Sequence, residues 1–589
     1  MRIRVGFALA TLAVGVGLGA SRLAAAAAPK DFWKASGAQG VVAAGGAEAA
    51  DAAIRILKNG GNAADAAVAS LLCLSVTDPA NFCFGGEVPI IVYDAKRNLV
   101  EIISGQGGAP RLATREYFVR HHGGRIPGSD DPTTVAVPGA PDAMLIALDR
   151  YGTKTFGEVA QPVLEILDGS GKGDRHLLPE RPATNLRSVP GFAQKVPVTF
   201  SGAPQPAWYP QLAKQIRRMI EAERASPDDR RRGLRQAADC FYRGPIARDL
   251  DAWSRKSGGL IRYVDLATHA TRIEDPISIE YRGFTVLKCG PWTQGPMMLQ
   301  TLRLLEKSDL RSMKQNSAEY VHVLTEAMKL ALADRDTYYA DPLFADVPLA
   351  RLLSEQYAAL RRPLVDLKKA SLELRPGDPR AGKAILGIAP KDYTAPREEV
   401  HDTTTCIVAD GSGNVVVATP SGWGGVMAGE TGIRLNSRLR SLNTWEGHPN
   451  CIEPGKRPRI TLTPTLVMKD GKPVAGISVA GGDLQDQVSL QVLLAWLEFG
   501  LTPADAVTRP RFYTDHLVGS FNQTPPQLGS LTVEKALGQD TIEALKTRGH
   551  QVKLGKPPFA HPIMVTIDPK TGTKQAAGDP KANRHARGY

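Results

Sequence analysis

The sequence predicts a mixed fold of class α/β (α+β), in which strand pairs and helices alternate on both sides of a largely helical middle region. Hydrophobic residues make up 43% and charged residues 22% of the 589 positions, which is ordinary for a globular chain and excludes a disordered or coiled-coil protein. Short apolar runs joined by tight polar turns predict strands towards both ends of the chain. Between residues 155 and 370 most segments have the helical period instead.

The first predicted elements are two helices followed by two strands. Ala47–Lys58 is an alanine-rich helical pattern that stops at an Asn-Gly-Gly sequence. Asn62, with Asp65 three residues later, predicts the N-cap of a second helix that runs to about residue 75. The apolar runs at 89–93 and 99–104 flank a charged turn, so we expect them to be paired strands.

The later elements follow a polar segment. A strand pair is expected around 277–287, and residues 371–402 lack an apolar period, which is typical of an exposed linker or loop. Further predicted elements are two hairpins and a long helix: strands 404–409 and 415–419, strands 462–468 and 473–480, and an amphipathic helix over 483–499.

The N-terminus is predicted to be an export signal. Arg2 and Arg4 precede an apolar stretch over residues 5–18, and the alanines at 24–28 provide a small-residue cleavage site. A retained membrane anchor is the alternative, but the apolar core is short and no stable membrane span is expected. We therefore expect residues 1–28 to be removed and the protein to be periplasmic or secreted.

The charge indicates no nucleic-acid partner, the cysteines and histidines indicate no metal site, and no cofactor is expected. The formal net charge is +12, but its basic residues are scattered and lack interleaved aromatic side chains, so a nucleic-acid groove is not expected. Six cysteines without a CxxC pair are too few for a disulfide scaffold, and buried free thiols are favoured over a Cys73–Cys83 bridge. The histidines have no ligand spacing, so no metal site is expected.

One hairpin carries residues that could perform chemistry. If Ala409 pairs with Asn414 across the predicted turn, Thr403 faces Pro420 and Ser421 lies one position beyond. A threonine beside a serine across a hairpin is usually a structural hydrogen bond. The functional reading is favoured by Gly481-Gly482 at a strand-to-helix junction, because backbone N–H groups at a helix N-terminus stabilise developing negative charge.

The same segments resemble the γ-glutamyltranspeptidase family. Residues 402–408, Asp-Thr-Thr-Thr-Cys-Ile-Val, and 410–417, Asp-Gly-Ser-Gly-Asn-Val-Val-Val, are similar to its Thr-Thr-His-x-x-Val-Val-Asp…Gly-Asn-Ala-Val segment. The resemblance covers nearly the whole chain after the signal. Further matching segments, in the family's order, are 56–68, 137–139, 151–152, 241–244, 428–433, 454–465 and 481–482.

This resemblance implies a four-layer αββα sandwich of the N-terminal nucleophile hydrolase type, made as one inactive chain. Thr403 would attack the Asp402 carbonyl and divide the chain into a large subunit, 29–402, and a small catalytic subunit, 403–589, which form one folding unit. The freed α-amino group of Thr403 would then be the general base for its own hydroxyl. Ser421 would hydrogen-bond the nucleophile, Gly481 and Gly482 would form the oxyanion hole, and Thr404 would support the site.

The substrate-binding positions depart from the family pattern. Gln106 stands where the family has an arginine for the substrate α-carboxylate, and Arg438 and Ser441 stand where it holds the α-amino group. Thr461 keeps a hydroxyl beside Ile460, which replaces a serine, and Trp423 falls near a substrate-binding asparagine. An arginine would repel an ammonium group, unless Arg438 only pairs with a nearby acid.

Three functions stay open on this evidence. The first is cleavage of γ-glutamyl amides such as glutathione through an acyl-Thr403 intermediate. The second is an amidase or acylase of altered acyl specificity, similar to the cephalosporin acylases. The third is a non-catalytic binding protein of the same fold, against which the retained Thr403, Ser421 and diglycine argue. The expected partners are a small-molecule amide and the chain's own processed halves.

Overall fold

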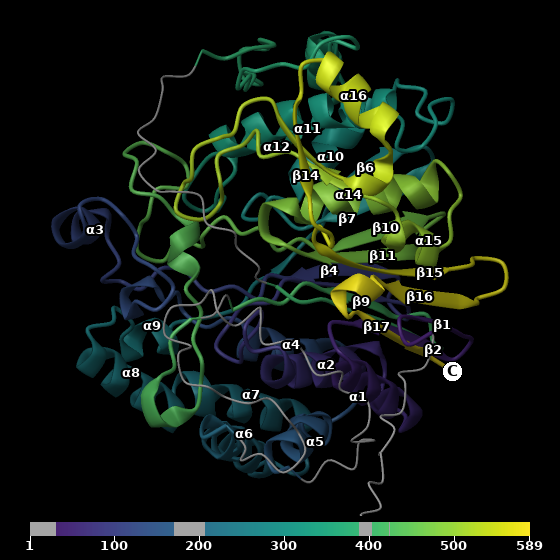
Figure 1. The fold of residues 1–589 in the computed structure, drawn as a ribbon. Helices are drawn as coiled ribbons and strands as arrows, with labels where there is room; N and C mark the ends of the chain where they lie inside the picture. Colours follow the sequence, from purple (N-terminus) through teal and green to yellow (C-terminus); the bar gives the residue numbers. More distant parts are fainter. Residues whose placement is uncertain (1–30, 170–205, 388–402, 423–424) are drawn as a thin grey trace, which may run out of the picture.

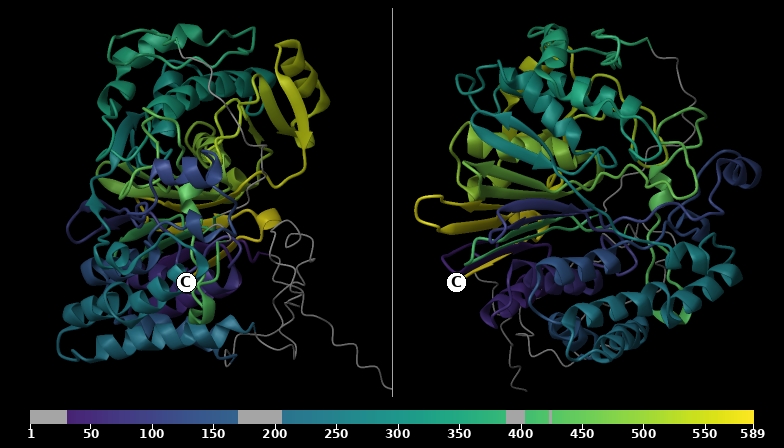
Figure 2. Two further views of the ribbon diagram at one scale, coloured as in Figure 1. Left: turned by 90° about the vertical axis from the view of Figure 1, so that its left-hand side faces the viewer. Right: turned by 180° about the vertical axis from the view of Figure 1, so that it is seen from behind.

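Two seven-stranded sheets lie face to face between two layers of helices (Figure 1). The computed structural model of the chain describes residues 31–169, 206–387, 403–422 and 425–589. One buried apolar cluster lies between the sheets, and two larger clusters join the outer face of each sheet to its helices. The expected αββα sandwich is therefore confirmed, and Figure 2 shows the same layers from two other sides.

The first sheet has the strand order β17-β2-β8-β9-β3-β4-β5, and its neighbouring strands are antiparallel. Strands from before and after position 403 are interleaved in it, so neither half of the chain forms this sheet alone. Its strands are β2 Gly40–Ala44, β3 Ile90–Asp94, β4 Leu99–Ile103, β5 Ile273–Glu274, β8 Cys406–Asp410, β9 Val415–Ala418 and β17 His585–Gly588.

The second sheet has the order β1-β16-β15-β11-β10-β7-β6 and also draws on both halves of the chain. Its strands are β1 Lys34–Gly37, β6 Ile277–Tyr281, β7 Phe284–Lys288, β10 Thr465–Lys469, β11 Lys472–Ala480, β15 His561–Ile567 and β16 Lys574–Gly578. A separate three-stranded sheet contains β12 Phe512–Tyr513, β13 Ser530–Glu534 and β14 Gln551–Gly555.

Helices from the N-terminal part of the chain cover the first sheet, in the lower half of Figure 1. They are α1 Ala47–Lys58, α2 Ala63–Thr77, α4 Ala140–Tyr151, α5 Phe156–Leu167, α6 Trp208–Arg224, α7 Arg230–Tyr242, α8 Pro245–Ser257 and α9 Tyr263–Ala267, while α3 Arg115–His122 packs in a small cluster of its own. The predicted N-cap of α2 is confirmed, because Asn62 and Asp65 form a reciprocal capping box.

The second sheet is covered by helices from both halves. They are α10 Pro296–Leu305, α11 Ala318–Tyr338, α12 Leu349–Leu352, α13 Glu355–Arg361, α14 Gln485–Leu497, α15 Pro503–Thr508 and α16 Gln539–Thr547.

The prediction of an amphipathic helix over 483–499 is wrong in one respect. Helix α14 is buried on all sides from Gln485 to Ala495, because it packs between the second sheet and its neighbours α10 and α15. Two of its buried polar side chains, Gln487 and Gln491, bind the backbone of residues 512–514.

The cysteine prediction is confirmed, since all six cysteines are buried and free of disulfides.

Residues 371–387, the described part of the predicted linker, contain neither helix nor strand. This stretch is nevertheless attached to the second helical layer. The Ser371 amide donates to Glu326, and the Gly377 amide donates to Asp334 at 2.8 Å. In the described parts of the chain we find no helix long and apolar enough to span a membrane.

Candidate active site

Thr403 lies just before β8, at the inner end of the central hairpin. Its side chain is buried and its backbone φ is 89°, a conformation that a β-branched residue rarely adopts. The Thr403 amide donates to the Asn81 carbonyl at 3.2 Å, and the same carbonyl accepts from the Gly422 amide at 3.1 Å. Asn81 therefore holds the two ends of the hairpin together.

The register predicted for this hairpin is wrong by one residue, and the correction brings the candidate pair closer. Cys406 faces Ala418, so the continued antiparallel pairing sets Thr403 opposite Ser421 rather than opposite Pro420. The Thr404 amide donates to the Pro420 carbonyl at 2.9 Å, which extends that register.

The turn explains the shift. Asp410 pairs with Asn414, which leaves a three-residue loop that ends in Gly413 at a φ of 91°. The Asp410 carboxylate accepts from the Ser412 and Asn414 amides, and its second oxygen accepts from the Ala63 amide at the start of α2 at 2.9 Å. The carboxylate therefore fixes both the register of the hairpin and its position against α2.

The predicted diglycine lies where β11 gives way to helix. Gly481 and Gly482 have φ values of 139° and 56°, and a Cβ on Gly481 would lie 2.8 Å from the Cβ of Ala560. A short 3-10 turn, Gly482–Leu484, follows and leads into α14. The first residue of α14, Gln485, donates from Nε2 to Thr403 Oγ1 at 3.2 Å. The helix N-terminus and the candidate nucleophile therefore meet at this hydrogen bond.

Buried charges hold the segment after the diglycine. Arg335 of α11 donates to Asp483 Oδ1 at 2.7 Å and to Gln294 Oε1 at 2.7 Å, and Gln294 in turn donates to the Gly482 carbonyl. Asp483 also accepts from the Ser520 amide at 2.9 Å. Burial raises the pKa of Asp483, but the Arg335 charge and the Ser520 hydrogen bonds outweigh it, and the net pKa lies below its ordinary value.

Arg438 is fully buried in a 3-10 turn, Arg438–Ser441, and it has two acceptors at the candidate site. Its Nε donates to Glu87 Oε1 at 2.7 Å, and its Nη2 donates to Ser421 Oγ at 2.8 Å and also contacts Glu87. Glu87 pairs with Ser421 through the backbone in both directions at 2.9 Å. The local acid considered from the sequence is therefore present, and it is Glu87.

The other predicted residues are all buried where the structure describes them. Gln106 Nε2 donates to the Pro458 carbonyl at 2.7 Å, and the Ser441 carbonyl accepts from Asn450 at 2.6 Å. Thr404 lies against Gly45, where a Cβ would come within 1.8 Å of its hydroxyl. Thr461 precedes β10 and is also buried. Asp402 and Trp423 lie outside the described residues.

A model of the family described as "Gamma-glutamyltranspeptidase" matches residues 49–589. The chain belongs to the gamma-glutamyltranspeptidase family. It is 29% identical to the "Glutathione hydrolase proenzyme" of Bacillus subtilis (strain 168), over 94% of this chain and 92% of that protein. It is also 30% identical to the "Acylase ACY 1 proenzyme" of Pseudomonas sp. (strain SE83), over 88% of both chains. The solved structure of LmbA2991HD is similar as well, with a TM-score of 0.84 and 34% identity over 94% of this chain and 99% of that one.

This member of the gamma-glutamyltranspeptidase family thus has the fold of the N-terminal nucleophile hydrolases. Among the predicted residues, the register continued beyond Cys406 and Ala418 sets Thr403 opposite Ser421, and a hydrogen bond joins Arg438 to Ser421. Gln106 and Ser441 make their described hydrogen bonds to other parts of the chain.

Three residues of the site were missed from the sequence. Glu87 is a single acidic residue that follows two glycines in an otherwise uncharged segment. This position was the signal in the sequence that could have indicated a role for it. Gln485 is the polar residue that begins the helix after the diglycine. Asn81 acts through its backbone carbonyl, which no side-chain pattern reveals.

A group outside this site has ligand-like geometry but unfavourable charges. Among the residues that the structure describes, His322, Glu326 and His550 hold ligand atoms within 4.8 Å of one another. Lys329 binds Glu326 at 2.6 Å and Arg375 binds it at 3.3 Å, so two cations already neutralise the only carboxylate of the group. His322 and His550 hydrogen-bond each other at 2.8 Å. These contacts favour a structural polar cluster over a metal site.

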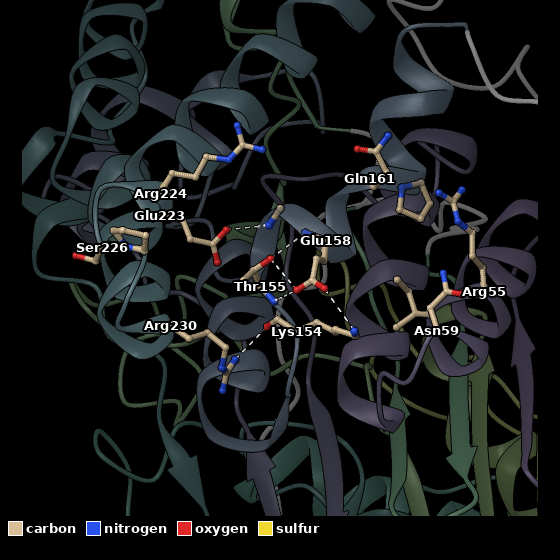
Figure 3. Close-up of a pocket in the computed structure, with 14 residues that line it drawn as sticks. Arg55, Asn59, Lys154, Thr155, Glu158, Gln161, Glu223, Arg224, Ser226 and Arg230 are labelled. Atoms are coloured by element: carbon tan, nitrogen blue, oxygen red, sulfur yellow. Dashed lines mark hydrogen bonds and ion pairs between the residues drawn. The ribbon is translucent and has the colours of Figure 1, made fainter.

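A pocket of about 550 Å³ lies elsewhere, among α1, α5, α6 and α7 (Figure 3). Its side chains are engaged with the protein: Lys154 pairs with Glu158, and Glu223 accepts from the amides at the start of α5. Arg230 donates to three backbone carbonyls. None of its lining residues belongs to the group around Thr403, so geometry alone does not make it the active site.

Proposed function

We propose that the protein is a self-processed amide hydrolase or acyltransferase that works through an acyl-Thr403 ester. The observation that carries this proposal is the position of Thr403. It faces Ser421 across the hairpin and accepts a hydrogen bond from Gln485, three residues after the diglycine. Each part of an N-terminal nucleophile site is thus represented: a hydroxyl, a polar partner for it, and backbone N–H groups at a helix start.

Processing would begin with attack of Thr403 Oγ on the Asp402 carbonyl carbon. The bond between that carbon and the Thr403 nitrogen breaks, the nitrogen takes the hydroxyl proton, and an ester replaces the amide. Water then hydrolyses the ester and leaves a carboxylate on Asp402 and a free amine and hydroxyl on Thr403. The φ of 89° supports this step, because backbone strain beside the scissile bond is released when the bond breaks.

In the processed enzyme the α-amino group of Thr403 would take the proton from its own hydroxyl. The unperturbed pKa of an α-amino group, about 7.7–8.0, suits a general base at neutral pH. The amides of Gly481 and Gly482 would stabilise the oxyanion of the tetrahedral intermediate. The same oxyanion hole would serve both steps, formation of the acyl-Thr403 ester and its cleavage. The same relatives are named proenzymes, which supports processing here.

The geometry favours an amide whose acyl group is not recognised through an α-amino and an α-carboxylate group, as it is in the family. A zwitterion needs an acceptor for its ammonium and a cation for its carboxylate. Arg438 is a cation that is already neutralised by Glu87, and Gln106 is bound to the Pro458 carbonyl. The relative named as an acylase supports this reading. A γ-glutamyl amide such as glutathione is the second candidate, supported by the relative named as a glutathione hydrolase.

The location proposed is outside the cytoplasm, periplasmic or secreted, after removal of residues 1–28. The processed halves would stay together as one heterodimeric unit, because each sheet contains strands of both halves paired with one another.

The test is the intact mass of the purified protein, compared with Thr403→Ala. Two chains with a new N-terminus at Thr403, absent in the variant, are expected. A single chain in the unaltered protein would refute the proposal.

A panel of γ-glutamyl, glutaryl and cephalosporin-type amides then separates the two candidates. Faster turnover of acyl groups without an α-amino group is expected, and a preference for γ-glutamyl donors would select the second candidate.

A further inference from the structure

The Arg438 guanidinium is held from several sides at one position. Its backbone amide donates to Asn436 Oδ1 at 3.0 Å, and its charged group lies 5.6 Å from the centre of the Phe521 ring. Glu87 binds it by a direct ion pair, and both side chains are at most 2% exposed. Such a pair is costly to break, because removing one partner leaves a buried charge without compensation.

The third contact of this guanidinium is the one that matters for chemistry. Nη2 donates to Ser421 Oγ at 2.8 Å, so Ser421 is the acceptor in that bond. A hydroxyl has a single proton, and this proton must therefore be directed away from Arg438. Thr403 is the residue opposite Ser421 when the register of β8 and β9 is continued through the Thr404–Pro420 hydrogen bond. A hydroxyl that accepts a charge-assisted hydrogen bond is also a stronger donor in its own bond.

We infer that Arg438, together with Glu87, is a positioning residue that orients the Ser421 hydroxyl towards Thr403, and that it does not bind the substrate. This inference rests on the proposed function, since it assigns Arg438 to the reaction of Thr403. The ion pair compensates the charge of Arg438 inside the protein, and Nη2 also donates a hydrogen bond to Ser421. Glu87 acts through Arg438 and fixes the plane of its guanidinium.

The experiment is a double-mutant cycle on chain cleavage, which needs no added substrate. Precursor made by cell-free synthesis is followed over time for the appearance of the two chains. The variants are Ser421→Ala, Arg438→Met and the combination of both. If Arg438 acts through Ser421, Arg438→Met slows cleavage by about 10- to 100-fold when Ser421 is present. In the Ser421→Ala background it changes the rate by less than about threefold. Equal factors in the two backgrounds would overturn the inference.

A second set of variants separates positioning from folding. Arg438→Met leaves Glu87 as a buried unpaired carboxylate, so its folding is compared by thermal unfolding with that of Glu87→Gln/Arg438→Met, which removes both charges. The double variant is expected to recover stability but to stay slow. Arg438→Lys, which keeps the charge, is expected to recover part of the rate. A double variant that cleaves as fast as the unaltered protein would overturn the inference.

Substrate kinetics give the last readout. Arg438→Met is expected to lower kcat for the amide of the panel that the enzyme turns over fastest. The ratio of the KM value for a carboxylate-bearing amide to that for a neutral amide is expected to stay unchanged. A selective rise in KM for the carboxylate-bearing amide would assign Arg438 to substrate binding instead. If the unaltered protein does not cleave itself at all, the proposed function fails first, so the two failures are distinguishable.

Discussion

At the scale of single residues, the candidate site depends on a few polar side chains that are buried with specific partners. Gln485 shows this most directly, because its side chain is fully buried and its amide donates to the Thr403 hydroxyl. The sequence places Gln485 only at the start of a helix. The hydrogen bond requires that α14 and β8, which belong to different layers, be brought together.

We expect Gln485→Ala to slow acylation of Thr403 by about 10- to 100-fold, because the nucleophile loses a donor that orients it. Burst kinetics with the preferred amide would measure this step. The matched control is Gln491→Ala, six residues further along the same helix. Gln491 binds the Phe512 backbone and not Thr403, so its loss should lower stability without changing the acylation rate. An unchanged rate in Gln485→Ala would contradict the assignment.

At the scale of elements, the sequence pattern of the central hairpin predicts its strands and its turn but not its register. Both strands were expected from the apolar runs, and the turn from Asp-Gly-Ser-Gly-Asn. The register was missed by one residue, because a four-residue and a three-residue loop fit the same letters. Asp410 decides between them through its hydrogen bonds to the Ser412 and Asn414 amides and to Ala63 of α2.

Replacing Asp410 with alanine should therefore destabilise the protein by about 2–4 kcal/mol, since the buried Ala63 amide and two partly buried turn amides lose their acceptor. Urea unfolding measures the difference. Asp568→Ala is the comparison, because Asp568 caps the exposed turn between β15 and β16 in a similar way. We expect a clearly smaller effect there, and equal effects would mean that burial of Asp410 adds nothing.

At the scale of the whole molecule, buried histidines connect α11 with His550, which follows α16, and connect both helical segments and residues 516–529 with the Asp366 and Glu373 carbonyls. His322 bonds to His550 and to the Asp366 carbonyl, and His516 bonds to the Glu373 carbonyl and to the Gly529 amide. Burial, with the nearby Lys329 charge, lowers the pKa of His516 to about 3 and that of His550 to about 2. These rings are therefore neutral in the folded protein at neutral pH.

Stability should consequently fall on acidification. In the unfolded chain these histidines take up protons below a pH of about 6.5, whereas in the folded protein they do so only near their lowered values. Their contribution is fully present above pH 6.5 and is lost as the pH falls from 6.5 towards 3. Each ring contributes a slope of at most about 1.4 kcal/mol per pH unit.

Urea unfolding between pH 7.5 and 5 would test this dependence, with His516→Gln as the variant. The variant should be less stable at pH 7.5 and should have a shallower dependence on pH, since one titrating ring is gone. The same slope in both proteins would show that His516 takes no part.

Much of this protein could be determined from its sequence alone. Local patterns were sufficient for α1, for the capping box of α2, for the hairpin strands and for the free cysteines, because each depends on residues close in the chain or on a single side chain's polarity. The order of motifs also identified the family and hence the four layers.

Only the tertiary structure decided how the charges at the site are used. Arg438 resembled a substrate-binding cation as long as its surroundings were unknown, and Glu87 lies 351 positions earlier in the chain. Burial against that acid, and against Ser421, changes what the arginine can bind, since its charge is compensated by Glu87 and its Nε and Nη2 donate to Glu87 and Ser421. The same residue type at the same position has a different chemistry depending on which distant segment folds against it.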